Sequence, residues 1–198
     1  MDINLNFYQR NKDSLIKQYD SVSFESVHKD WLEYIPSKGA VLDIGAGSGR
    51  DARYLSSLGL KVFAAEPVLS LLISARENSV DHDIIWFQDK LPALYEAKTL
   101  GTKFELILLS AVWMHLSPEE RILSMQNMSS LINAGGKLVI TLRYGEFSDG
   151  RSAFPISVDE VKKLADANGL NPLLETELNP DQLGRGKVVW QTVVLGKK

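Results

Sequence analysis

Short apolar runs alternate with longer amphipathic stretches along most of the chain. Several of these runs are apolar at every position, which is typical of strands that lie between two layers of helices. The alternation therefore predicts an α/β fold with a mostly parallel sheet. The predicted strands of this parallel part are residues 40–44, 61–65, 83–87, 104–109 and 137–143.

The end of the chain departs from this alternation. Residues 170–176 and 188–195 both read as strands, and the stretch between them is rich in turn residues, so we expect an antiparallel hairpin there. Two helices have recognisable starts, since Ser117 and Ser157 each precede a glutamate by three residues. Pro118 follows the first serine, where a missing N–H costs little.

The N-terminal part is predicted to be helical. Val27, Trp31 and Ile35 recur at helical spacing before Pro36. We therefore expect residues 1–36 to form a helical cap and 37–198 to form the main domain.

Composition narrows the classes of protein and ligand. The chain has 198 residues, 44% of them hydrophobic and 24% charged, which suits one compact globular domain. It has no cysteine, a net charge of −3 and no export signal, so we expect a cytoplasmic protein with no metal site. Because no basic stripe is present, nucleic acid is disfavoured. No stretch suits a membrane span, and we expect a monomer or homodimer.

A glycine-rich turn carries the strongest functional signal. Asp43 ends an apolar strand, and Gly45, Gly47 and Gly49 follow before a helix begins at Arg50. Glycines in such a turn let a nucleotide-like ligand approach the backbone at the carboxyl edge of the sheet. The dinucleotide pattern G-x-G-x-x-G requires glycine where Arg50 stands, which weakens a nicotinamide oxidoreductase hypothesis. A turn without a ligand would have the same glycines.

Two further acidic residues follow the second and third predicted strands. Glu66 follows the second strand, where a carboxylate can accept hydrogen bonds from both hydroxyls of a ribose. Asp89 follows the third strand, where it could accept from an adenine amine or serve only as a turn residue. An acidic lining favours a ligand with a cationic ammonium and sulfonium over a pyrophosphate. S-adenosylmethionine is such a ligand.

These features together resemble class I S-adenosylmethionine-dependent methyltransferases. The resemblance rests on the run 41–49, on Glu66 and Asp89, and on the segments 104–110 and 131–138. It implies a Rossmann-like three-layer sandwich whose seven-stranded sheet has an antiparallel last strand. It also implies that the following residues contact the cofactor: Asp43, Gly45, Ala46, Gly47, Gly49, Arg50, Glu66, Pro67, Asp89, Lys90, Leu91 and Ser110.

The catalytic side of the site is less clearly marked. Methyl transfer needs alignment of nucleophile, methyl and sulfur, and a general base only where the nucleophile arrives protonated. His115, after the fourth strand, is the candidate base, although packing ahead of the next helix explains it equally well. Tyr19 is a candidate lid residue over the cofactor, and Arg143 a candidate for holding an anionic or polar substrate.

The substrate hypothesis rests on absences. Enzymes that methylate amino groups of DNA bases or of glutamine carry Asn/Asp-Pro-Pro-Tyr/Phe after the fourth strand, whereas residues 110–113 read Ser-Ala-Val-Trp. A small molecule is therefore the leading substrate class, ahead of a protein or tRNA. The rival hypothesis is a catalytically silent S-adenosylmethionine-binding regulator or partner subunit.

Overall fold

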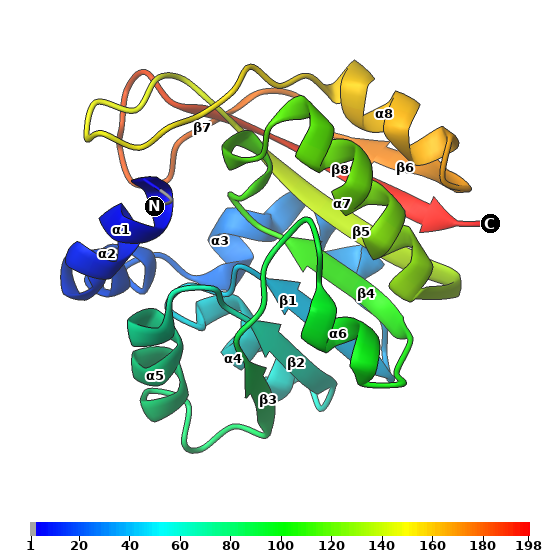
Figure 1. Cartoon of the computed structure of the whole chain (residues 1–198), viewed down its shortest axis with the longest axis horizontal. Helices are drawn as coiled ribbons and strands as arrows, with labels where there is room; N and C mark the ends of the chain where they lie inside the picture. Colours follow the sequence, from blue (N-terminus) through cyan, green and yellow to red (C-terminus); the bar gives the residue numbers. More distant parts are fainter. Residues whose placement is uncertain (1–2) are drawn as a thin grey trace.

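The structure is a computed structural model that describes residues 3–198 (Figure 1). Its centre is a sheet with the strand order β3-β2-β1-β4-β5-β8-β6. Strands β3, β2, β1, β4 and β5 pair in parallel, and β8 is antiparallel to both β5 and β6. The predicted sheet with its antiparallel last strand is confirmed. The strands are β1 (Ala40–Ile44), β2 (Lys61–Ala65), β3 (Ile84–Phe87), β4 (Phe104–Leu109), β5 (Ile132–Tyr144), β6 (Leu170–Glu175) and β8 (Val189–Lys197).

The sheet differs from the prediction at two places. Strand β5 begins at Ile132, because Ile132 already pairs with Phe104 before a shift of register. An eighth, two-residue strand, β7 (Asn179–Pro180), pairs with β8 inside the stretch expected to be a turn.

Helices cover both faces of the sheet, which confirms the three-layer sandwich. On one face lie α6 (Tyr95–Thr99), α7 (Pro118–Leu131) and α8 (Val158–Asp166), whose apolar side chains share a core with one side of the strands (Figure 1). On the other face, α3 (Phe24–His28), the 3-10 helix η1 (Lys29–Tyr34) and α4 (Arg50–Ser57) share a second core with the opposite side. Helix α5 (Leu69–Glu77) follows β2, and the 3-10 turn η2 (Trp113–His115) follows β4.

The N-terminal segment is helical, as expected, but its apolar positions differ from those predicted. Phe24, His28 and Trp31 are buried, whereas Val27 and Ile35 are only half-buried. The reason is that α3 ends at His28 and continues as a 3-10 helix, in which residues three apart share a face. Before it come α1 (Ile3–Arg10) and α2 (Lys12–Tyr19). No helix in residues 3–198 is long and apolar enough to cross a membrane.

Both predicted helix starts are present. Ser117 accepts a hydrogen bond from the Glu120 amide, and the Glu120 carboxylate accepts one from the Ser117 amide, which completes the capping box. Ser157 likewise accepts from the Glu160 amide. The Glu160 carboxylate instead accepts a hydrogen bond from the buried Arg121 at 2.8 Å, and this ion pair links α7 to α8.

Candidate functional site

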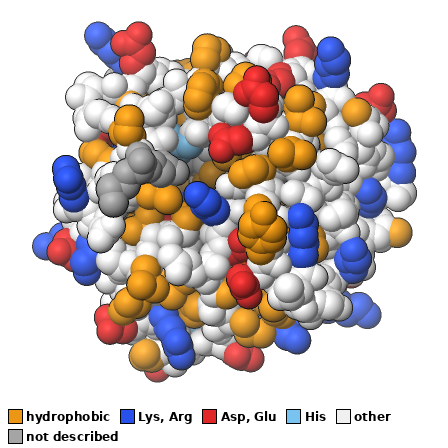
Figure 2. Space-filling model, in the orientation of Figure 1, with side chains coloured by type: hydrophobic (Ala, Val, Ile, Leu, Met, Phe, Trp, Pro, Cys, Tyr) orange, Lys and Arg blue, Asp and Glu red, His pale blue; other side chains and the backbone are white. Residues whose placement is uncertain are grey.

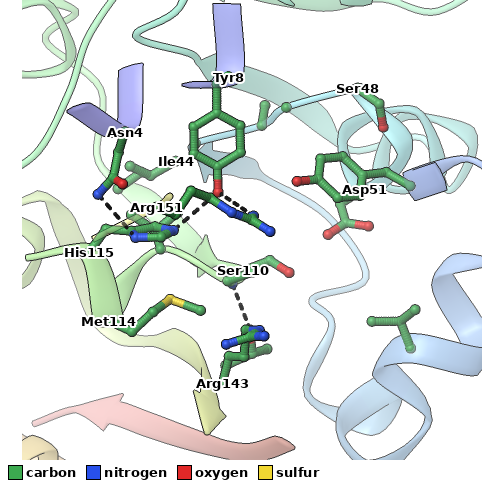
Figure 3. Close-up of a pocket in the computed structure, with 18 of the residues that line it drawn as sticks. Asn4, Tyr8, Ile44, Ser48, Asp51, Ser110, Met114, His115, Arg143 and Arg151 are labelled. Atoms are coloured by element: carbon green, nitrogen blue, oxygen red, sulfur yellow. Dashed lines mark hydrogen bonds between the residues drawn. The ribbon is translucent and has the colours of Figure 1, made fainter. Parts of the chain in front are cut away.

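A cavity opens where the order of the strands reverses. Strands β1 and β4 are neighbours, but the chain continues from them to opposite sides of the sheet, which leaves a crevice outside their carboxyl ends. The cavity has a volume of about 600 Å³ and is lined by the loops that follow β1 to β5, by the N-terminal helices and by the turn before β8. Figure 3 shows side chains from these segments pointing into the same space.

The glycine turn forms one wall of the cavity. Gly45, Gly47 and Gly49 all have positive φ, which favours glycine. A Cβ at Gly45 would lie 2.6 Å from Val112 Cγ2, so a side chain there would also clash with the loop after β4. Gly45, Ala46 and Gly47 line the cavity. Gly49 does not line it, and its Cα instead faces Trp86 from the start of α4.

Glu66 connects this turn to the end of β2. Its Oε2 accepts a hydrogen bond from the Gly47 amide at 2.9 Å, and its Oε1 accepts one from the Val68 amide at 2.8 Å. Burial raises the pKa of Glu66 to about 7, although both amide bonds act in the opposite direction. Each oxygen keeps a lone pair, so the carboxylate can also accept hydrogen bonds from a ligand in the cavity.

Asp43 is a buried carboxyl group with an unsatisfied oxygen. It is the last residue but one of β1, it lines the cavity, and its Oδ2 has no hydrogen-bond partner among residues 3–198. Burial raises its pKa well above the usual range, and the nearby Asp51 and Glu66 add to this effect against Arg50. A cationic or hydrogen-donating ligand group would offset the free-energy cost of burying this carboxyl group.

Asp51 and Arg50 form an ion pair with each other. The Arg50 Nε donates to Asp51 Oδ1 at 2.6 Å, and His28 Nε2 lies 3.0 Å from Asp51 Oδ2. Burial alone would raise the pKa of Asp51, but His28 and Arg50 outweigh it and hold the pKa well below the usual range. Both residues line the cavity. Arg50 therefore orders Asp51, and its contact with the cofactor stays a prediction.

Asp89 has a structural role in addition to its place in the cavity wall. Its Oδ1 accepts from the Lys90 amide and its Oδ2 from the Ala97 amide, both at 2.9 Å, which ties the loop after β3 to α6. Each oxygen retains a further acceptor position for a ligand. The other residues predicted around the cofactor also line the cavity: Pro67, Lys90, Leu91 and Ser110.

At the other end of the cavity, His115 is hydrogen-bonded through both ring nitrogens. Nδ1 lies 2.8 Å from the Ser152 carbonyl oxygen and 3.2 Å from Asn4 Nδ2, and Nε2 lies 3.1 Å from the Tyr8 hydroxyl (Figure 3). The shorter Nδ1 contact is to an oxygen that can only accept, so we assign the hydrogen to Nδ1, which leaves Nε2 to accept from Tyr8 and the Asn4 amide to donate to the Ser152 carbonyl. Arg151 Nη1 in turn donates to the Tyr8 oxygen at 3.2 Å.

Tyr19 lines the cavity beside the glycine turn. Its backbone oxygen accepts from Arg50 Nη1 at 3.3 Å, which fixes the end of α2 to the start of α4. Burial raises the pKa of Tyr19 above its usual value, and Tyr8 adds to the rise. The phenol is therefore neutral at physiological pH, which suits a wall of the cavity.

Arginine side chains gather near His115. Arg143, at the end of β5, and Arg151 both lie against the ring of Phe147, with distances of 3.8 and 4.2 Å from guanidinium carbon to ring centroid. Arg185 approaches from the turn before β8, and all of these side chains line the cavity. Burial lowers the pKa of Arg143, and the charges of Arg185 and Arg151 lower it further.

The structure therefore brings together every predicted site residue except Gly49. It also adds Asp51, Phe147 and Asp181, which the sequence did not predict. Asp51 had a weak signal, since it is an acidic residue in the first turn of the helix after the glycines. Phe147 and Asp181 lie in loops and had none.

Comparison with known proteins places the chain in a family. The profile of the family described as "Tellurite resistance protein TehB" matches residues 7–161. A probable S-adenosyl-L-methionine-dependent methyltransferase TehB of Haemophilus influenzae is 27% identical over 140 residues, which are 69% of this chain and 46% of that protein. An uncharacterized methyltransferase of Bacillus cereus is 27% identical over 168 residues, covering 81% of this chain and 74% of that protein.

Solved structures agree with the fold. The crystal structure of TehB from Haemophilus influenzae has a TM-score of 0.68 and 22% identity, covering 95% of this chain and 67% of that one. Magnesium protoporphyrin IX methyltransferase from Synechocystis, with bound SAM, has a TM-score of 0.69 and 14% identity, covering 96% and 84%.

The chain spans about half the length of the first curated relative that it matches. The family profile, however, covers most of the chain. The chain belongs to the TehB family of class I S-adenosylmethionine-dependent methyltransferases.

Proposed function

We propose that the chain transfers the methyl group of S-adenosylmethionine to a small molecule bound at the His115 end of the cavity. The observation that carries this proposal is the continuity of one cavity, which joins Asp43 and Glu66 to His115, Arg143 and Phe147. A volume of about 600 Å³ is within the range of small-molecule sites. A cofactor held at the acidic end leaves the rest of this space for an acceptor.

The surface also supports a small acceptor. In Figure 2, acidic, basic and hydrophobic side chains are mixed around the pale-blue histidine, and the basic side chains that gather toward the right edge of the view lie away from it. Residues of α1, including Asn4 and Tyr8, line the cavity and cover its His115 end. A covered site excludes water and limits the size of the acceptor.

When bound, S-adenosylmethionine supplies a methyl group that is activated for displacement by its sulfonium. The chain's own residues orient the acceptor and exclude water from it. Where the acceptor atom carries a proton, the Tyr8 oxygen can receive that proton while Tyr8 passes its own to His115 Nε2. The Ser152 carbonyl holds the imidazole so that Nε2 faces Tyr8.

The test is turnover with a panel of acceptors, read out as S-adenosylhomocysteine. We expect product with at least one small molecule among organic acids, phosphate esters, amines, thiols, tellurite and selenite. Bulk tRNA and a mixed protein extract serve as separate arms, and Glu66→Ala is the control with impaired cofactor binding. Product with tRNA or protein alone would overturn the proposal. Tight binding of S-adenosylmethionine without product in any arm would favour a regulator instead.

Binding of S-adenosylmethionine should strengthen as the pH rises. The pKa of Glu66 is about 7, above its usual value, so the carboxyl is mostly protonated near pH 6, whereas ribose hydroxyls bind the ionised form. Binding near pH 6 must therefore release a proton, and the affinity should rise roughly eightfold between about pH 6 and about pH 7.5. Calorimetry at both pH values measures this, and Glu66→Gln should reduce the change. Equal affinity at both pH values would contradict the assignment of Glu66.

A further inference from the structure

Arg143 is a buried guanidinium without a carboxylate partner. Its side chain is 6% exposed and lines the cavity, and it forms no ion pair within residues 3–198. Nη1 donates to the Gly145 carbonyl at 2.5 Å, and Nη2 contacts the Glu146 carbonyl at 3.4 Å. The buried Nε has no hydrogen-bond partner among residues 3–198. A buried charge that lacks a counter-charge is costly unless a ligand supplies one.

The neighbouring arginines are different in this respect. Arg151 binds Asp149 through Nη2 at 2.6 Å, and Arg185 binds Asp181 through Nη2 at 2.6 Å. Their charges are thus largely balanced within the chain. The net positive charge at this end of the cavity is that of Arg143.

The two ends of the cavity differ in charge, although Arg50 and Lys90 also lie at the glycine-turn end and Asp181 at the arginine end. The carboxyl groups gathered at the glycine-turn end belong to Asp43, Asp51, Glu66 and Asp89. That end suits the cationic part of S-adenosylmethionine, whereas the arginine end repels cations. Arg143 therefore faces the region that the cofactor leaves for the acceptor. Beside it, Phe147 and Met114 supply apolar surface.

We propose that Arg143 binds an anionic group of the methyl acceptor, a carboxylate or a phosphate on a small organic acid, whose organic part packs against Phe147 and Met114. This inference rests on the proposed function, since it concerns the acceptor of that reaction. The planar guanidinium matches either oxyanion in a bidentate manner, because Nη1 and Nη2 each keep one N–H beyond their contacts with the Gly145 and Glu146 carbonyls.

The experiment measures binding to the protein saturated with S-adenosylhomocysteine, so that it does not depend on turnover. The probes are benzoate, phenyl phosphate, neutral benzamide and selenite, each titrated by calorimetry. We expect benzoate or phenyl phosphate to bind at least tenfold more tightly than benzamide, and the better of the two identifies the anion. Arg143→Gln should weaken that binding at least tenfold, and Arg143→Lys should weaken it less.

Matched measurements separate the possible failures. Arg76→Gln, on the exposed side of α5, should leave binding of the organic acid unchanged. An unchanged affinity of Arg143→Gln for S-adenosylhomocysteine shows that this variant is folded. Equal binding of benzamide, no effect of Arg143→Gln, or binding of selenite without either organic acid would each overturn the inference. If S-adenosylhomocysteine itself does not bind, the proposed function fails instead.

Discussion

Replacing Glu66 with alanine should weaken binding of S-adenosylmethionine by at least ~1.5–3 kcal/mol, which is roughly 10- to 150-fold in Kd. The carboxylate stands at the end of β2, where it can accept hydrogen bonds from the ribose hydroxyls. It also holds the amides of Gly47 and Val68, so its removal loosens the turn against which the ligand must lie. Both the lost ligand contacts and the less ordered turn lower the affinity for S-adenosylmethionine.

Calorimetry on the purified variants measures this effect. Glu66→Gln should lose most of the affinity as well, because one end of an amide is a donor and cannot accept from an amide N–H or a hydroxyl. Glu105→Ala is a matched control, since this carboxylate lies on β4 outside the cavity and binds Asn133 at 2.7 Å. An unchanged Kd for Glu66→Ala would remove Glu66 from the site.

The strands nearest the site were predictable because local pattern alone determines them. Strands β1, β2 and β4 have the predicted bounds, since each is a short apolar run that ends at a polar or glycine residue. The glycine turn was equally predictable from the sequence, because positive φ at Gly45 and Gly47 restricts the residue type. Local signals therefore predicted the residues that line the glycine-turn end of the cavity.

The His115 end of the cavity depends on contacts between distant parts of the chain, which no local pattern reveals. Asn4 binds the backbone of Ser152 at a separation of 148 residues, and Tyr8 reaches His115 at a separation of 107. These pairs arise only when α1 packs over the loops after β4 and β5. His115 could be singled out from the sequence, but its partners could not.

Asp89 shows a different limit of sequence reasoning. Its position after β3 predicted a contact with adenine, and the structure shows that its carboxylate also holds the amides of Lys90 and Ala97. One side chain can order a loop and face a ligand together, so the two interpretations of a strand-end acid do not exclude each other. The contact with adenine stays a prediction.

Replacing His115 with glutamine should lower kcat by about 10²–10⁴-fold where the acceptor loses a proton, which is the range for loss of a general base. Only an unprotonated Nε2 can accept the proton from Tyr8, and a glutamine side chain has no nitrogen that can take this role. Binding of S-adenosylmethionine should change little, because His115 lies at the other end of the cavity from Glu66.

Tyr8→Phe tests the same pathway without altering the imidazole. It removes only the hydroxyl that lies 3.1 Å from His115 Nε2, so a fall in kcat with unchanged cofactor affinity would show that Tyr8 takes part in the proton transfer. Tyr34→Phe is the matched control, because that hydroxyl contacts the Leu173 carbonyl outside the cavity. Thermal unfolding of each variant separates catalysis from folding. If His115→Gln lowers stability and activity together while Tyr8→Phe stays fully active, His115 serves to hold Ser152 and α1 in place and is not a base.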